Sequence, residues 1–304
     1  MMGKRIETAI EAKGLYKTWG KVHALNGVDL KVGEGQVFGV LGPNGAGKST
    51  MLRTISGLLN PTKGEIFVSN INVMKHRLQA QTNITYLPGD VRLYDNLSGW
   101  ENLRFLGDLH TLPPARQSEL MDRFKLSNNE LGRKIRTYSS GMRQKVAIIA
   151  TFQHDVPIYI LDEPTEGLDP LMQAEFAQLI EEQAKAGKTI LLSSHTLSEV
   201  ERTCDHIAIL RQGEIIFNGE LKDLRKKAIR QLDVTFGKAV VIDWQKLKGV
   251  VSLSGTKTRH IVAFRGNPKP FIAKLAAHPV EDLNLSSASL DETFLNMYRE
   301  EEDV

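Results

Sequence analysis

The first part of the chain alternates between apolar and polar residues, which is the period of a half-buried strand. Alternating segments fill residues 6–40, and Asn26-Gly27 and the Gly-Glu-Gly at 33–35 are predicted to be the turns between them. The segment 63–70 (KGEIFVSN) predicts a further edge strand. Between these strands a helical period begins after Gly47, with one apolar face formed by Met51, Leu52, Ile55, Leu58 and Leu59.

The middle of the chain has a helical pattern from about residue 96 to residue 152. It is interrupted by Pro113-Pro114 and by a polar segment at 127–129, which is predicted to be a loop. Strands and helices then alternate, and a hairpin is predicted to turn at Gln212-Gly213. The predicted alternation is a strand at 157–161, a helix near 171–186, a strand at 189–193 and a helix near 197–204.

This order of elements is typical of an α/β core with a mostly parallel sheet. We expect an antiparallel β lobe before it and a helical subdomain at about 92–153. After Gly219 the pattern changes to a basic, helical connector at 221–230 (LKDLRKKAIR). Strand-like runs at 232–236, 250–253 and 260–264 follow, with a helix near 268–277 and a last helix near 289–299. We therefore predict two domains, residues 1–219 and a small α+β accessory domain over 220–304.

Composition adds a few exclusions. The 304 residues are 41% hydrophobic, enough for one large domain or two moderate ones, and a formal charge of +3 gives no reason to expect nucleic acid as a partner. Cys204 is the only cysteine, so an intrachain disulfide is excluded and a reducing compartment is favoured. No stretch approaches the roughly 18 uninterrupted apolar residues of a membrane helix, and the start lacks an apolar run of signal-peptide length. We expect a soluble cytosolic protein.

Acidic residues follow the apolar run at 158–161 directly. That run is short and predicts a strand buried on both faces, yet it ends in Asp162-Glu163, and Glu166 and Asp169 follow closely. Ionised carboxylates at the end of a buried strand are costly unless a positive group pairs with them. A cationic partner is therefore expected nearby.

Residues 42–50 (GPNGAGKST) supply that partner, because they match the pattern G-x-x-x-x-G-K-[ST] between a predicted strand and a predicted helix. Glycines let successive backbone N–H groups surround phosphate oxygens, and the helix N-terminus adds a favourable dipole. Lys48 is expected to reach the β- and γ-phosphates, and the Ser49 hydroxyl to bind Mg²⁺. The predicted ATP-binding residues of this loop are Gly42, Asn44, Gly45, Gly47, Lys48, Ser49 and Thr50.

The two strand-end acids then acquire distinct roles. Asp162 is expected to hold the Mg²⁺ directly or through water. Glu163 is placed to orient and deprotonate an attacking water. The carboxyl ends of parallel strands share one edge of the sheet, where the phosphate loop also lies. The sequence thus predicts a magnesium-dependent nucleotide hydrolase.

A third segment narrows the class further. Residues 138–144 (YSSGMRQ), together with Asp162-Glu163-Pro164, the segment 166–169 (EGLD) and His195, resemble the ATP-binding subunit of ABC transporters. The resemblance covers about residues 5–218 with the motifs in order. It implies a P-loop NTPase core with an antiparallel β lobe and a helical subdomain, with ATP and Mg²⁺ as cofactors.

The resemblance also assigns further residues. Trp19 is similar to the aromatic residue that stacks on adenine, with Tyr16 nearby as a rival. Ser139-Ser140-Gly141 resembles the signature loop that contacts the γ-phosphate bound to the opposite subunit. Ser140 stands where a second glycine is usual and Met142 where a glutamine is usual. Asp169 resembles the acid of the loop at the dimer interface, and His195 the histidine that senses the γ-phosphate.

One position departs from the family pattern. A glutamine that touches Mg²⁺ usually follows a motif like ITYLP, but this chain has Gly89-Asp90 there. Either Asp90 replaces the glutamine as an acceptor for metal-bound water, or the connection between the core and the helical subdomain works without a side chain at this position. A plain Pro-Gly turn explains the segment equally well.

The family works as head-to-tail dimers in which ATP closes the interface and hydrolysis opens it. One set of motifs implies a homodimer or a close paralogue as partner. Because no membrane segment is predicted in this chain, the resemblance also implies that it docks on a separate integral-membrane permease, at the cytoplasmic face of the cell membrane. The segment 289–298 (SLDETFLNMY) resembles the tails of bacterial ATPases that serve drug and antibiotic exporters, which favours export. The alternative is a terminal helix that packs on its own domain through Leu290, Phe294, Leu295 and Tyr298.

The alternative function is a soluble ABC-type ATPase that acts on a non-membrane partner. Only 90 residues separate Lys48 from Ser139, which excludes a coiled-coil insertion, and one cysteine is too few for a zinc module. Translation-type members carry two cores, and this chain has one. Intact Glu163 and His195 favour turnover over a nucleotide-gated scaffold. The basic segment 221–230 is interpreted as a solvated face, and no specific nucleic acid is expected.

Overall fold

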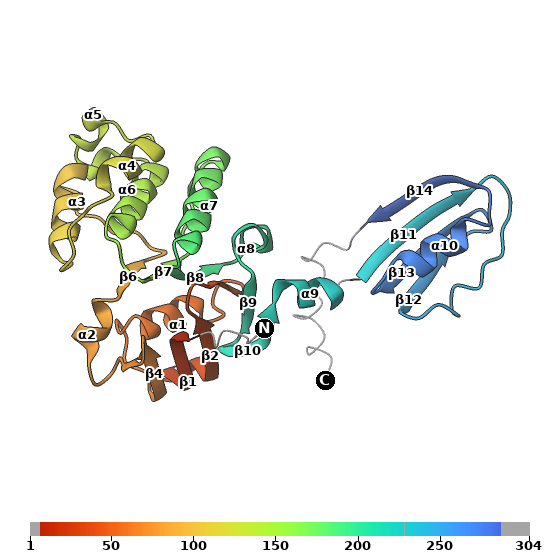
Figure 1. The fold of residues 1–304 in the computed structure, drawn as a ribbon, viewed down its shortest axis with the longest axis horizontal. Helices are drawn as coiled ribbons and strands as arrows, with labels where there is room; N and C mark the ends of the chain where they lie inside the picture. Colours follow the sequence, from red (N-terminus) through yellow and green to blue (C-terminus); the bar gives the residue numbers. More distant parts are fainter. Residues whose placement is uncertain (1–6, 228, 287–304) are drawn as a thin grey trace. The chain divides into compact units, whose positions relative to one another are not determined.

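The structure is a computed structural model that describes residues 7–227 and 229–286 (Figure 1). Two compact units make up the chain, residues 1–218 and residues 219–304. Among the described residues, no helix combines the length and the apolar character needed to cross a membrane.

A six-stranded sheet forms the centre of the first unit, in the order β10-β9-β3-β8-β7-β6. The pairs β9–β3, β3–β8, β8–β7 and β7–β6 are parallel. Every residue of β3, β7 and β8 is buried, as expected for strands covered on both faces. The bounds are β3 (Val37–Leu41), β6 (Ile84–Leu87), β7 (Ile158–Asp162), β8 (Thr189–Ser194), β9 (His206–Arg211) and β10 (Glu214–Glu220).

Helix α1 (Lys48–Ile55) follows β3, α7 (Pro170–Lys185) connects β7 to β8, and α8 (Leu197–Thr203) connects β8 to β9. Within the segment 157–204, the bounds of the helices and strands agree with the predicted bounds to within one residue. The predicted hairpin is also confirmed, because Gln212 and Gly213 both have positive φ (46° and 81°), as a type I′ turn requires. The predicted α/β fold with a mostly parallel sheet is confirmed.

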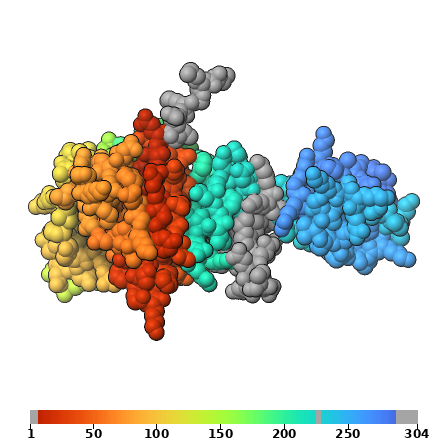
Figure 2. Space-filling model, turned by 90° about the horizontal axis from the view of Figure 1, so that it is seen from below, coloured from red at the N-terminus to blue at the C-terminus, as the bar shows by residue number. Residues whose placement is uncertain are grey.

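An antiparallel lobe, β2-β1-β4-β5, packs against this sheet and α1 in one apolar core. Figure 2 shows its red and orange segments exposed on one face of the unit. The predicted turn at Asn26-Gly27 is wrong, because β2 continues through it. Gly27 has φ 77°, the pairing of β1 with β2 shifts register here, and the Tyr16 ring lies against the glycine. The lobe contains β1 (Thr8–Trp19), β2 (Val22–Gly33), β4 (Lys63–Val68) and β5 (Ile71–Asn72).

The helices of the middle segment lie together in Figure 1, apart from the short α2 (Arg77–Gln81). They are α3 (Gly99–Asp108), α4 (Gln117–Arg123), α5 (Asn128–Leu131), a 3₁₀ turn (Ile135–Thr137) and α6 (Ser140–Phe152). The loop predicted at 127–129 is wrong, because Ser127 is the N-cap of α5 and Asn128 and Asn129 are helical. Its Oγ accepts a hydrogen bond from Glu130 N (3.2 Å), and the Glu130 carboxylate accepts one from Ser127 N (2.9 Å). This is the S-x-x-E capping box.

The second unit is a four-stranded antiparallel sheet, β12-β13-β11-β14, whose core includes α10. Phe271 of α10 stacks on Phe264 of β13 with ring centroids 3.8 Å apart, and Trp244 completes the apolar layer. The elements are α9 (Leu221–Lys227), β11 (Ile229–Phe236), β12 (Val250–Gly255), β13 (Arg259–Arg265), α10 (Lys269–Leu275) and β14 (Val280–Ser286).

Two corrections concern this unit. Ile229 and Arg230, predicted at the end of the helical connector, begin β11, where they pair with Arg265 and Phe264 of β13. The edge strand β14 was not predicted, since its exposed residues are too polar to signal a strand. The last predicted helix, near 289–299, lies outside the described residues.

Candidate functional site

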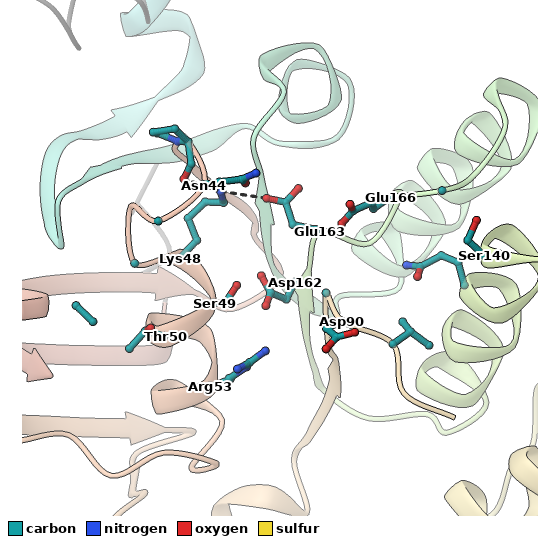
Figure 3. A pocket seen from close by; sticks show the side chains of 18 of the residues that line it. Asn44, Lys48, Ser49, Thr50, Arg53, Asp90, Ser140, Asp162, Glu163 and Glu166 are labelled. Atoms are coloured by element: carbon teal, nitrogen blue, oxygen red, sulfur yellow. Dashed lines mark hydrogen bonds and ion pairs between the residues drawn. The ribbon is translucent and has the colours of Figure 1, made fainter. Parts of the chain in front are cut away.

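A cleft of about 670 Å³ opens where the phosphate loop and the end of β7 meet the segments at 89–91 and 140–144 (Figure 3). Ten of the residues predicted for the site line it: Asn44, Gly45, Gly47, Lys48, Ser49, Thr50, Asp90, Ser140, Asp162 and Glu163. Six others are not in its lining: Trp19, Gly42, Ser139, Gly141, Asp169 and His195. Most of the predicted constellation is therefore gathered around one cavity.

The loop at 42–47 takes its path because glycine alone fits at two positions. Gly47 has φ 107°, and a Cβ there would lie 2.4 Å from the Ala24 carbonyl oxygen. A Cβ at Gly42 would lie 2.5 Å from the Leu210 carbonyl oxygen. Substitution at either glycine would push the loop away from its neighbours, so the geometry of the loop depends on both.

Lys48, the first residue of α1, is buried and turned back toward its own loop. Its Nζ donates hydrogen bonds to the carbonyl oxygens of Gly42 (2.6 Å) and Pro43 (3.2 Å). The same nitrogen lies 3.1 Å from Glu163 Oε1, an ion pair without hydrogen-bond geometry (Figure 3). The cationic partner expected from the sequence is thus Lys48, and it pairs with Glu163 rather than with Asp162.

Glu163 connects three parts of the site. Its Oε2 lies 2.7 Å from Nδ1 of His195, at the end of the neighbouring strand β8. Its backbone has φ 47°, a left-handed conformation that costs a non-glycine residue about 1–3 kcal/mol. The Glu163 N–H donates to Ser193 Oγ (3.1 Å), which helps to hold this conformation. The turn directs the carboxylate to Lys48 and His195 together.

Asp162 is completely buried and has two neutral donors. Ser193 Oγ donates to its Oδ1 (2.7 Å), and the Tyr86 hydroxyl donates to its Oδ2 (3.3 Å). Burial, followed by the charge of Asp162, raises the pKa of Tyr86 to about 12, so that the phenol stays neutral and can donate. In the part of the chain that the structure describes, no Lys, Arg or His nitrogen lies within ion-pair distance of Asp162.

The donor set around Asp162 fits a hard divalent cation. Across the cleft, the Ser49 hydroxyl points toward the Asp162 carboxylate (Figure 3). One carboxylate and one hydroxyl, completed by phosphate oxygens and waters, are ligands that Mg²⁺ accepts. A buried carboxylate whose only partners are neutral is also a group that a cation would stabilise. The residues present therefore fit a magnesium ion.

At the position of the usual glutamine, one residue of Gly89-Asp90 faces Asp162 and the other carries the polar side chain. A Cβ added at Gly89 would lie 3.2 Å from the Asp162 carbonyl oxygen and 3.4 Å from its Cγ, so position 89 faces Asp162. Asp90 lines the cleft but is exposed, and its Oδ2 lies 2.7 Å from Nη2 of Arg92. The residue that faces Asp162 thus has no side chain, and the residue with the carboxylate stands one position further along.

The segment 139–141 forms the start of α6. Ser139 caps the helix by accepting a hydrogen bond from Met142 N (3.3 Å). Ser140 is the first helical residue and has no positive φ, so the serine in place of the usual glycine causes no backbone strain. At Gly141, by contrast, a Cβ would lie 2.9 Å from the Gly167 carbonyl oxygen, so glycine is needed for this close approach.

Two predicted residues have local partners of their own. Trp19 ends β1, is 53% exposed, and has Lys17 Nζ 4.2 Å from its ring centroid. Val22, its partner in the strand pairing, lines the cleft. Asp169 is exposed and caps α7, because its Oδ1 accepts a hydrogen bond from Met172 N (3.0 Å).

The sequence did not indicate three residues that hold this arrangement. Ser193 donates to Asp162 and accepts from Glu163, and the signal was a polar residue at the end of an otherwise apolar strand. Tyr86 lies inside the ITYLP segment, where its hydroxyl donates to Asp162. Arg53 lines the cleft, and its Nε donates to the Tyr86 hydroxyl (3.4 Å). No local pattern distinguishes this arginine from other helix residues.

Comparison with known proteins gives the family. Residues 25–166 match the family model described as ABC transporter. The chain is 34% identical to the daunorubicin resistance ATP-binding protein DrrA3 of Streptomyces coeruleorubidus, over 96% of each chain. It is 31% identical to the linearmycin resistance ATP-binding protein LnrL of Bacillus subtilis, over 95% of this chain and 97% of that one.

Solved structures agree with this result. An ATP-binding subunit of an ABC transporter is 33% identical, with a TM-score of 0.67 over 72% of this chain and 93% of its own. A dimeric ATP-binding cassette in a post-hydrolysis state with ADP and Pi is 26% identical, with a TM-score of 0.63 over 70% of this chain and 98% of its own. The chain therefore belongs to the ATP-binding proteins of ABC transporters, and it is an ATP-binding and ATP-hydrolysing subunit of this family.

Proposed function

We propose that this ATPase energises a separate integral-membrane permease and that transport is directed outward. The observation that carries the proposal is the similarity to two resistance ATP-binding proteins over at least 95% of their length, which includes the second unit. The alternative, a soluble ABC-type ATPase that acts on a non-membrane partner, has no support among these relatives. We place the chain on the cytoplasmic face of the membrane, bound to its permease.

The proposed chemistry follows from the cleft. The loop at 42–50 binds the phosphates, and Lys48 exchanges its contacts with Gly42 and Pro43 for phosphate oxygens. Ser49 and Asp162 would hold Mg²⁺, which supplies positive charge to the phosphate oxygens. Glu163 takes a proton from the attacking water, and His195 holds the Glu163 carboxylate through Nδ1. Oε1 of Glu163 faces Lys48 and Oε2 faces His195. Hydrolysis therefore requires the carboxylate to leave Lys48, so that one oxygen can accept the proton.

The complete site is proposed to need a second subunit, either a copy of this chain or a close paralogue. Ser139, Ser140 and Gly141 would meet the γ-phosphate bound to the partner, and Asp169 would lie at the interface. In this role the exposed position of Ser140 leaves its hydroxyl free for the partner's nucleotide. Trp19 is proposed to stack on adenine, for which Lys17 would have to leave the ring face.

The transporter assignment is tested by recovering the tagged chain from detergent-extracted cell membranes, without and with ATP, and identifying what co-purifies. A stoichiometric multi-spanning membrane protein is the expected result. Recovery in the soluble fraction alone, with ribosomes, nucleic acid or nothing, would reject the permease and leave the ATPase chemistry intact. The Glu163→Gln chain serves as a second bait, because slower hydrolysis should prolong the ATP-bound complex.

Asp90 is proposed to accept a hydrogen bond from a metal-bound water in place of the usual glutamine. Replacement of Asp90 by alanine is then expected to raise the Mg²⁺ concentration for half-maximal ATPase activity by about tenfold, the lower end of the range for outer-shell ligands. A Mg²⁺ titration of steady-state hydrolysis measures this, with Asp108→Ala on the exposed end of α3 as the control. An unchanged Mg²⁺ requirement would mean that the connection between the core and the helical subdomain works without a side chain at this position.

A further inference from the structure

Glu199, in α8, ties together the two loops that carry the catalytic residues. Thr165 Oγ1 donates a hydrogen bond to its Oε1 (2.8 Å), and Ser194 Oγ donates to its Oε2 (2.7 Å). Thr165 lies in the loop that follows Glu163, and Ser194 is the last residue of β8, directly before His195. One carboxylate thus accepts hydrogen bonds from a hydroxyl in the loop after Glu163 and from a hydroxyl at the end of β8, directly before His195.

The hydrogen bonds around Glu199 fix the direction of the chain after β8. Ser194 is completely buried, and its Oγ also accepts a hydrogen bond from Thr196 N (2.9 Å). The backbone therefore folds around the Ser194 hydroxyl, with His195 between the two bonded residues. Because hydrogen bonds to an ionised carboxylate are shorter and stronger than neutral ones, Glu199 is the strongest acceptor in this group.

Packing between the Thr165 loop and α8 is incomplete at one place. A hollow of about 170 Å³ borders Thr165, Glu199 and Gln173. Side chains beside a hollow lack contacts on one side, so that they are free to shift unless a directed interaction holds them. The bond from Thr165 to Glu199 supplies that interaction across the edge of the hollow.

We infer that Glu199 is a positioning residue for ATP hydrolysis. It keeps the loop after Glu163 and the loop of His195 in one relative geometry, which preserves the 2.7 Å contact between Glu163 Oε2 and His195 Nδ1. Glu199 acts through His195 and does not touch the nucleotide cleft, whose lining excludes it. The inference rests on the roles proposed for Glu163 and His195.

The test uses the full chain in steady-state ATP hydrolysis and in nucleotide binding. Glu199→Ala removes both acceptors and is expected to lower kcat by about 10- to 100-fold, the effect of a small misplacement in an active site. The KM for ATP and the nucleotide affinity should stay within about twofold. Glu199→Gln keeps one acceptor oxygen and should recover part of kcat. Glu181→Gln, on the exposed side of α7, is the matched control and should keep wild-type kcat.

A double-mutant cycle with His195→Ala separates positioning from a general loss of structure. If Glu199 acts through His195, the variant with both substitutions has the same kcat as His195→Ala alone. Fully additive losses, or an unchanged kcat in Glu199→Ala, would overturn the inference. If Glu199→Ala does not fold, Thr165→Val takes its place in the test. This substitution removes one donor and leaves α8 intact, and it should lower kcat by a smaller factor. Should Glu163→Gln keep wild-type kcat, the proposed catalytic roles fail independently of Glu199.

Discussion

Replacement of Glu163 by glutamine is expected to leave ATP binding intact and to slow hydrolysis by about 10²–10⁴-fold, the usual effect of losing a general base. Glutamine has the size of glutamate, so the left-handed turn at this position and the bond from its N–H to Ser193 Oγ are retained. The amide cannot take a proton from water. It also no longer attracts the Lys48 ammonium, which becomes available to a phosphate at lower cost.

Single-turnover hydrolysis and equilibrium binding of a fluorescent ATP analogue measure the two effects separately. Glu181→Gln makes the same chemical change on the exposed side of α7, where the carboxylate pairs only with Lys185 in the part of the chain described, and should leave both quantities unchanged. Turnover of Glu163→Gln at the wild-type rate would remove Glu163 from the mechanism. Loss of binding would indicate that the carboxylate supports the loop at 42–47 rather than the reaction.

The parts of the site that the sequence predicted are those whose geometry is local. The path of the loop at 42–47 depends on glycines that are themselves in the motif, and the helix after it begins at Lys48. Asp162 and Glu163 end a strand whose apolar run fixes its place in the sheet. A local pattern fails where a contact from another strand overrides it. Asn26-Gly27 is a common turn pair, yet here a cross-strand tyrosine covers the glycine and the strand continues.

The contacts that complete the site depend on which strands are neighbours and in which register. Asp162 meets Ser193 because these two residues are partners in the pairing of β7 with β8. Tyr86 reaches Asp162 from β6, on the other side of β7. Glu199 of α8 meets Thr165 of the loop after Glu163, 34 residues earlier in the sequence. Nothing in a local pattern specifies these pairings, so the residues that position the carboxylates emerged only from the structure.

Replacement of Lys48 by alanine is expected to weaken ATP binding by about 10- to 150-fold, which corresponds to the 1.5–3 kcal/mol of a hydrogen bond to a charged group. The ammonium already has partners in this structure, Gly42, Pro43 and Glu163, and these must be exchanged for phosphate oxygens. We therefore expect the lower part of that range. Equilibrium titration with a fluorescent ATP analogue measures the change, and Lys185→Ala, on the exposed side of α7, is the matched control. Unchanged affinity would contradict the phosphate-loop assignment.

The same substitution also separates the two roles of Lys48. Without the lysine, the Glu163 carboxylate, whose side chain is 12% exposed, keeps only His195 as a partner among the described residues, and the free energy of unfolding should fall by about 1–3 kcal/mol. Adding Glu163→Gln removes the uncompensated charge. The double variant should therefore regain stability in thermal unfolding while its affinity for ATP stays low. If affinity returned together with stability, the effect of Lys48 on binding would be an effect of Glu163 repelling the phosphates, and direct contact between the lysine and the nucleotide would be rejected.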